Sequence, residues 1–290
     1  MVVSLHSHSG QFCLHAHGNL EDVVLKAIEK GFKVYGLSEH VPRSRAQDLY
    51  PEESHLTPQD TYNTFVEFYR TARHLQSKYE SQIQLLVGLE TEWIHSGTLS
   101  ELQALVQAYP VDYMVGSVHH VNTVPIDYDT GLYAKAVEAA QQSSLEGLFR
   151  DYFDQQHSML AALKPLVVGH FDLVRIFAPA GFELSAEVWD KIRRNVALIV
   201  EYGGLVELNS RAWKKGLRGA YPQADIIEYM KTQDVKFTLS DDSHGPNDVG
   251  MHYDKLMAYV HEMGLHGRIF YPERTAASSV VVARLDTAST

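Results

Sequence analysis

Histidines gather at the amino terminus of this 290-residue sequence, where the segment HSHSGQFCLHAHG (residues 6–18) contains four of the sixteen in the chain. His6 and His8 are separated by one residue. If they continue a β-strand, both side chains point to the same side, because strand side chains alternate. Two imidazoles on one face can bind one metal ion, and histidine is the commonest metal ligand in proteins. A single histidine in a loop is more often solvated than a ligand, so the positions of the others decide the interpretation.

Candidate ligands follow six of seven short apolar runs in the sequence. We expect each run to form a strand, because strands buried on both faces of a parallel sheet are almost wholly apolar. The predicted strands are residues 2–5, 34–38, 83–89, 113–118, 166–169, 205–208 and 235–239. The candidate ligands are His6, His8 and His15; Glu39 and His40; Glu90 and Glu92; His119 and His120; His170 and Asp172; and Asp241, Asp242 and His244.

Amphipathic stretches separate these runs and predict helices. The first begins after Asn19, a residue type that caps helices, and ends at Gly31, a residue type common just beyond them. The others are residues 58–79, 99–109, 145–163, 186–202, 224–232 and 253–263. Alternating strands and helices are typical of a mostly parallel α/β fold. An open nucleotide-binding sheet would usually have a glycine-rich turn after its first strand. Histidines occupy that turn here, so we expect a seven-stranded barrel of the TIM type.

In a parallel barrel the carboxyl ends of the strands share one rim, and active sites lie there. The scattered candidate ligands would therefore meet. Imidazole suits zinc, iron and manganese, whereas carboxylate oxygens suit manganese and magnesium. Seven histidines with two carboxylates are too many for one ion and fit two or three ions that share a bridging carboxylate. We expect Cys13 to be a small buried apolar residue rather than a thiolate ligand.

Composition narrows the class of protein. A hydrophobic content of 45% and a charged content of 21% are those of an ordinary globular protein. The single cysteine excludes an intrachain disulfide and, with no signal-peptide pattern, leads us to expect a reducing, cytoplasmic location. No apolar run reaches membrane-spanning length, and a net charge of −11 argues against a broad nucleic-acid-binding face. The sequence leaves the oligomeric state open.

Six short motifs, in this order, resemble those of the polymerase-and-histidinol-phosphatase (PHP) family, in particular its histidinol-phosphatase branch. They are HSHS…CLH, SEHVP, GLETEW, GSVHH, GHFDLVR and SDDSH, and the resemblance extends to about residue 272. Each motif alone is weak, but six in order are specific. The resemblance implies one PHP-type domain over residues 1–290, folded as a distorted (β/α)7 TIM-like barrel with a trinuclear metal centre.

The ligand assignments are also what the resemblance implies. One metal would be bound by His6, His8, Glu90 and Asp242, and Glu90 would bridge to a second metal bound by His119 and His170. His15, His40 and His244 would bind the third. Two alternatives stay open. His17 competes with His15, and Asp241 competes with Asp242, although the family spacing to His244 favours Asp242.

Hydrolysis of a phosphate monoester needs neutralised phosphoryl oxygens, a nucleophile at neutral pH and assistance to the leaving alkoxide. Two metal ions can supply all three, because they bind both oxygens of an in-line displacement and lower the pKa of a bridging water. We therefore expect a metal-dependent phosphomonoesterase with Zn, Mn or Fe, in which Glu90, Asp242 and His244 are catalytic. The resemblance implies the substrate L-histidinol phosphate and a place in histidine biosynthesis.

A net-negative chain needs local positive charge to bind a phosphate ester. The predicted substrate contacts are Arg43, Arg175, Arg211, Lys214 and His120; Arg45 and Lys215 are further basic candidates. Residues 38–58 lack a clear period and are expected to form a lid or binding loop. Asp48, Glu52 and Glu53 in that loop could bind the positive end of histidinol phosphate.

Three other classes fit parts of the pattern. A phosphodiesterase or exonuclease of the same family is the main alternative, but the sequence lacks a basic groove and further domains. A metal-dependent amidohydrolase often has a bridging lysine after a middle strand, where this chain has Glu90. A metal-binding scaffold would have no reason to place basic loops around its ligands.

Overall fold

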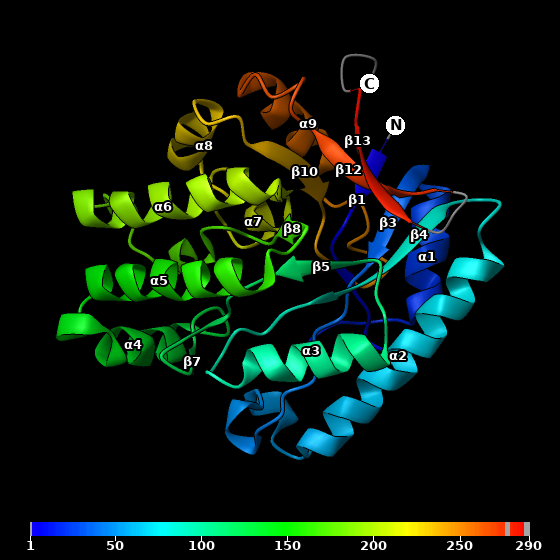
Figure 1. Ribbon diagram of the computed structural model, residues 1–290, viewed down its shortest axis with the longest axis horizontal. Coiled ribbons are helices and arrows are strands. Elements are labelled where there is room, and N and C mark those ends of the chain that lie inside the picture. Colours follow the sequence, from blue (N-terminus) through cyan, green and yellow to red (C-terminus); the bar gives the residue numbers. More distant parts are fainter. Residues whose placement is uncertain (1, 276–278, 287–290) are drawn as a thin grey trace.

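Seven parallel strands form the main sheet of the computed structural model, which describes residues 2–275 and 279–286 (Figure 1). All seven were predicted from the apolar runs. Their order in the sheet is β1 (Val2–Ser4), β3 (Phe32–Leu37), β4 (Gln84–Glu90), β5 (Tyr113–Gly116), β8 (Val167–Val168), β9 (Leu205–Asn209) and β10 (Lys236–Ser240). Because every neighbouring pair in this sheet is parallel, all the carboxyl ends of the strands lie at the same rim.

The sheet curls until its two edges meet. The amide of Leu5, just after β1, donates to the carbonyl of Leu239 in β10 over 3.3 Å. Beyond this contact, β2 (Ser7–His8) pairs in parallel with β11 (Ser243–His244). The result is a nearly closed seven-stranded barrel, as predicted. The closure also brings His8 from the first motif beside His244 from the last.

The barrel interior is filled by side chains rather than open. Tyr113 points inward from β5, is 4% exposed, and donates its hydroxyl to the Leu5 carbonyl over 2.6 Å. Gly36 and Gly88 lie against this ring, and a Cβ atom at either position would overlap it. A large side chain therefore fits here only because two neighbouring strands carry glycine.

Helices cover the outside of the barrel (Figure 1). The seven predicted ones are α1 (Leu20–Glu29), α2 (Pro58–Lys78), α3 (Thr98–Ala108), α5 (Leu145–Leu163), α6 (Ala186–Tyr202), α8 (Ala224–Lys231) and α9 (Tyr253–Glu262). Ser144 and Ser185 cap α5 and α6 by accepting backbone N–H bonds. Asn19 precedes α1 as predicted but makes no such bond, because its side chain donates to Asp22 instead.

The structure also contains elements that the sequence pattern did not predict. Two of them are the helices α4 (Thr130–Ala139) and α7 (Arg211–Lys214). Two antiparallel hairpins join β6 (His120–Val121) to β7 (Val124–Pro125) and β12 (Phe270–Arg274) to β13 (Val280–Arg284). Four short 3-10 helices complete the set: η1 (Ala46–Asp48), η2 (Pro51–Glu53), η3 (Gln141–Ser143) and η4 (Leu173–Arg175). Within the described residues, no helix is long and apolar enough to cross a membrane.

Candidate metal centre

Glu90 lies at the centre of the rim, at the end of β4, and is 1% exposed. One carboxylate oxygen, Oε1, is 3.1 Å from His6 Nε2, 3.2 Å from His119 Nε2 and 3.0 Å from His170 Nε2. The other, Oε2, is 3.4 Å from His8 Nε2 and 3.0 Å from His40 Nδ1. A single carboxylate therefore faces five imidazoles from both of its oxygens, which is the arrangement a bridging ligand needs.

Several histidines of the cluster use their second ring nitrogen to contact another acceptor. Such an outer partner fixes the orientation of a metal-ligating histidine and leaves its other nitrogen for the ion. The Nδ1 atoms lie 2.9 Å from Glu207 for His6, 3.2 Å from Glu39 for His8, 3.1 Å from Glu92 for His119 and 3.0 Å from the Asp242 carbonyl for His244. Within the described chain, Nε2 of His6 and of His8 is buried and has no hydrogen-bond partner. These nitrogens fit metal binding, since leaving a buried polar atom unpaired is costly.

The ligand atoms fall into overlapping groups, each compact enough for one ion. The groups are His6, His8 and Glu90; Glu90, His119 and His170; His8, His40 and His244; and Cys13, His15 and His40. Within each group the ligand atoms lie within 4.8 Å of one another. The first two groups share Glu90; the first contains three of the four ligands implied for one metal, without Asp242, and the second contains the three implied for the other. The remaining two groups share His40. The ligands implied for the third metal are divided between them, with His244 in one group and His15 in the other.

The group of Cys13, His15 and His40 contains the only cysteine of the sequence. Cys13 Sγ lies 3.2 Å from His15 Nε2, and His15 Nδ1 lies 3.1 Å from Glu52. Burial raises the pKa of the Cys13 thiol, but hydrogen bonds to His15 and His40 outweigh it and lower that pKa to about 6. Burial lowers the pKa of His15, but its bonds to Cys13 and Glu52 raise it to about 9. Cys13 is buried, as expected, yet it faces the ligands. His17 is exposed and lies outside the cluster.

Adjacent aspartates follow β10 and face different ways. The Oδ1 atom of Asp242 lies 3.8 Å from His6 Nε2 and 3.7 Å from His8 Nε2. Asp241 instead accepts hydrogen bonds from Ser4 Oγ, the Tyr35 hydroxyl and the Gly250 amide inside the barrel wall. The structure therefore places Asp242 among the candidate ligands and Asp241 outside them.

Opposite charges dominate the electrostatics of the cluster. Burial raises the pKa of the Glu90 carboxyl, but His6, His119 and His40 together hold it well below its ordinary value. Burial lowers the pKa of His6, but Glu90, Asp242 and Glu207 raise it well above the ordinary value. The carboxylates stay ionised and attract positive charge to the centre, which a divalent ion would supply more compactly than protons on the rings.

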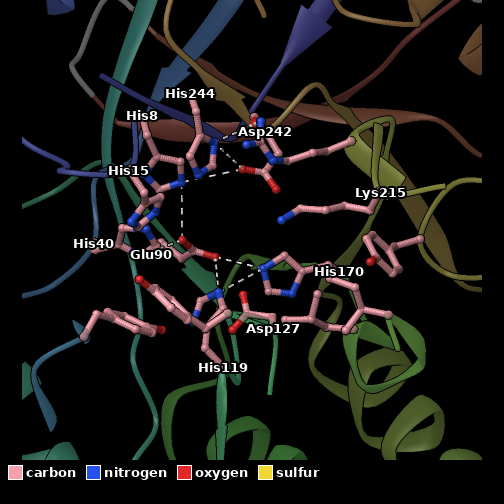
Figure 2. A pocket seen from close by; sticks show the side chains of 16 residues that line it. His8, His15, His40, Glu90, His119, Asp127, His170, Lys215, Asp242 and His244 are labelled. Carbon is pink, nitrogen blue, oxygen red and sulfur yellow. Dashed lines mark hydrogen bonds and ion pairs between the residues drawn. The ribbon is translucent and has the colours of Figure 1, made fainter. Parts of the chain in front are cut away.

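The cluster opens on a cavity of about 220 Å³ (Figure 2). The metal-ligand candidates that line it are His8, His15, His40, Glu90, His119, His170, Asp242 and His244. Figure 2 shows Lys215 reaching into the cavity from one side and Asp127 lying near His119 and His170. Tyr50 and Tyr221 contribute aromatic wall, and Leu173 and Ile176 contribute aliphatic wall. The space suits a small ligand with one strongly charged end.

A model described as the PHP domain matches residues 4–211, more than half of the chain. The chain belongs to the PHP family. A Schizosaccharomyces pombe protein named "probable histidinol-phosphatase" is 47% identical over 269 residues, which cover 91% of this chain and 88% of that protein. The histidinol-phosphatase of Saccharomyces cerevisiae is 31% identical over 293 residues, covering 89% and 87%.

The fold is also that of a solved structure. The histidinol phosphate phosphatase of Lactococcus lactis, crystallised with zinc, L-histidinol and phosphate, superposes with a TM-score of 0.72. The match covers 96% of this chain and 98% of that one at 18% identity, so it bears on the fold alone.

Only one of the predicted substrate contacts of this PHP chain, Arg211, reaches the cavity. Its Nη1 donates to the Asp242 carbonyl over 3.0 Å and contacts Asp248. Lys214, predicted as a contact, pairs with Asp248 over 2.9 Å outside the cavity, whereas the next residue, Lys215, lines it. Within the described residues the side chain of Lys215 makes no hydrogen bond or ion pair, so its ammonium is free to bind a ligand.

The other predicted contacts lie away from the cavity because acidic neighbours bind them. Arg43 is buried and pairs with Glu53 of η2. Arg175 pairs with Asp172 over 3.2 Å and with Asp225 over 2.7 Å. His120 is buried behind Tyr50, with its Nδ1 3.6 Å from Glu92. Sequence distance from a ligand did not indicate the direction in which these side chains turn.

Four polar residues of the cavity were not predicted: Tyr50, Asp127, Tyr128 and Tyr221. Tyr50 comes from the loop expected to bind ligand, but no feature of the loop distinguished it. Tyr221 and Asp127 lie in stretches without strand or helix signals. Asp127 follows the β6–β7 hairpin, whose strands of two residues each are too short for any periodic pattern.

Proposed function

We propose that this chain hydrolyses L-histidinol phosphate to L-histidinol and phosphate with two or three divalent ions of zinc, manganese or iron. The observation that carries the proposal is the position of Glu90, which faces five imidazoles at the floor of a cavity that also contains Arg211 and Lys215. Relatives named as histidinol-phosphatases align over nearly the whole chain and support the substrate. The Lactococcus lactis protein was crystallised with zinc and both products of this reaction.

The residues that would hold the ions are those that the PHP resemblance implies, and they overlap the observed groups. His6, His8, Glu90 and Asp242 would hold one, and Glu90, His119 and His170 a second. The third would be held by His15, His40 and His244, with Cys13 beside them. Bound divalent ions supply the positive charge that stabilises phosphoryl oxygens and activates water at neutral pH.

The chain's own groups then bind and orient the ester. Arg211 is held at the cavity edge by the Asp242 carbonyl and Asp248, and Lys215 is unpaired within the described residues, so both can donate to phosphate oxygens. Burial raises the pKa of Asp242, but His6, His244 and Arg211 hold it well below its ordinary value, so its carboxylate stays ionised and can orient the attacking water.

His244 suits a ligand better than a proton donor. Burial lowers the pKa of its imidazole, and the neighbouring His8 and Arg211 lower it further. The ring therefore stays neutral at physiological pH, and Nδ1 is held by the Asp242 carbonyl.

A panel of three esters tests the proposal. The metal-loaded protein is assayed with L-histidinol phosphate, p-nitrophenyl phosphate and bis(p-nitrophenyl) phosphate. We expect the highest kcat/KM for L-histidinol phosphate and little hydrolysis of the diester. A preference for the diester would support the phosphodiesterase alternative, and no hydrolysis of any ester would contradict phosphatase function.

A further inference from the structure

Asp127 carries a negative charge into the cavity without a partner. Within residues 2–275 and 279–286 its carboxylate forms no ion pair, and its Oδ1 atom is buried without a hydrogen bond. Removing an ionised carboxylate from water is costly unless another group compensates for the charge. The geometry therefore points to a cation that arrives with the ligand.

The acidic residues expected to bind that cation are all occupied. Asp48 accepts from Arg45 over 2.6 Å, Glu52 contacts His15 over 3.1 Å, and Glu53 pairs with Arg43. Asp48 and Glu53 do not line the cavity, and Glu52 faces a metal-ligand candidate. Among these acidic groups and Asp127, only Asp127 is both unpaired and in the cavity.

The fold places Asp127 close to the reacting end of the ligand. The β6–β7 hairpin turns the chain back so that the amide of Ile126 donates to the carbonyl of His119 over 2.9 Å. Asp127 is the next residue and lies near the His119 ring in Figure 2. A cation that pairs with it must therefore be only a few atoms from the phosphate.

We propose that Asp127 is a specificity-determining residue that binds the primary ammonium of the substrate. The inference rests on the proposed function, since L-histidinol phosphate carries its ammonium on the carbon next to the ester methylene, whereas its imidazole is one methylene further away. An ammonium donates well to a carboxylate, and such charge-assisted bonds are roughly twice as strong as neutral ones. The substrate class of the cavity is thus a phosphate monoester of a 2-amino alcohol.

The test compares Asp127→Asn with the wild type on two substrates. One is L-histidinol phosphate, and the other is its analogue without the amino group, 3-(imidazol-4-yl)propyl phosphate. We expect the substitution to lower kcat/KM for L-histidinol phosphate about 10- to 100-fold, because one hydrogen bond to a charged group is lost. The value for the analogue should stay unchanged, and so should the metal content.

Two further variants control for charge and for folding. Asp129→Asn removes the same charge two residues away. It keeps an oxygen for the cap of α4, where Asp129 accepts from the Leu132 amide over 2.7 Å. Asp129→Asn should leave the ratio of kcat/KM for the two substrates unchanged. Asp127→Glu retains the charge and should retain part of the preference for the amino substrate. L-Histidinol should inhibit Asp127→Asn more weakly than the wild type, whereas inorganic phosphate should inhibit both equally.

The outcomes separate this inference from the proposed function. Equal losses on both substrates, no loss on L-histidinol phosphate, or the same loss in Asp129→Asn would each overturn the role of Asp127. If the wild type hydrolyses neither substrate, the proposed function fails. Calorimetric binding of L-histidinol and its analogue without the amino group then still decides whether Asp127 recognises the ammonium.

Discussion

Glu90 and Glu92 are two residues apart on the same strand end, and the structure gives them different surroundings. Glu90 faces the Nε2 atoms of His6, His8, His119 and His170, which are the nitrogens available to metal. Glu92 lies behind them, with Oε2 3.1 Å from His119 Nδ1. Glu90 is therefore placed to bridge ions, and Glu92 is placed to hold a ligand histidine in orientation.

The pair gives a matched comparison. We expect Glu90→Gln to lose nearly all turnover and much of its metal, because the amide cannot bridge two cations. Glu92→Gln should lose about 10- to 100-fold in metal affinity or activity, as loss of an outer partner typically does, and excess metal should restore part of it. Metal content and turnover across a zinc or manganese titration measure both, and equal defects would contradict the assignment.

The adjacent aspartates differ in the same way. Asp241 is buried in the barrel wall, where burial raises its pKa to about 6 and three kinds of donor contact it. Asp242 lines the cavity and has φ +46°, a conformation that asparagine tolerates well. An asparagine at residue 242 can therefore adopt the observed backbone conformation. An asparagine at residue 241 would instead place its N–H₂ group against other hydrogen-bond donors.

We expect Asp242→Asn to fold normally and to lose most phosphatase activity. Asp241→Asn should instead destabilise the fold by about 1–3 kcal/mol, the cost of an unsatisfied buried polar group. Urea unfolding and steady-state turnover separate the two effects. If Asp241→Asn were inactive but stable while excess metal rescued Asp242→Asn, the ligand would be Asp241.

At the scale of elements, length decided what the sequence could predict. The seven barrel strands and seven longer helices carry periodic apolar patterns. Strands β6 and β7, helix α7 and the 3-10 helices are two to four residues long and carry no such pattern. Helix α4 has ten residues, but only Tyr133 and Ala136 are buried, so its pattern is weak. The missed elements matter, because the β6–β7 hairpin positions Asp127.

The close packing inside the barrel can be tested at Gly36. A Cβ atom there would lie 2.9 Å from the Leu5 Cα atom and would overlap the Tyr113 hydroxyl. We expect Gly36→Ala to destabilise the protein by about 1–3 kcal/mol, as overpacking of a core does. Gly267→Ala is the control, since no atom lies within 4 Å of its Cβ position. Equal thermal melting of the two variants would contradict the packing described for Tyr113.

Across the whole molecule, the meeting of the candidate ligands at one rim could be predicted, and the directions of the basic side chains could not. Each ligand is fixed at a strand end, and a parallel barrel brings all strand ends to one rim. Most of the predicted basic contacts are held away from the cavity by acidic residues, whereas Arg211 reaches the cavity although it also contacts Asp248. Arg43 pairs with Glu53, Arg175 with Asp225 and Lys214 with Asp248. The paired residues lie far apart in the sequence or in loops without a periodic pattern, so the sequence does not predict these contacts. That residues 1–290 form one domain stays a prediction.

The buried ligand cluster should couple metal binding to stability. A ligand that binds only the folded state stabilises it by about 2.7 kcal/mol when present at 100 times its Kd. We expect chelator-treated protein to melt at a lower temperature and added zinc or manganese to reverse the change. The melting temperature of Glu90→Gln should rise less than that of the wild type when metal is added. No shift in the wild type would indicate that these residues do not bind metal in the folded protein.

Hydrolysis of L-histidinol phosphate during stoichiometric metal titration tests the central claim most directly. The protein is first stripped of metal with a chelator, and zinc or manganese is then added while turnover and bound ions per chain are measured together. The account predicts no turnover in the stripped protein and a plateau at two to three bound ions per chain. Full activity with one ion or none, or no hydrolysis at any loading, would contradict it.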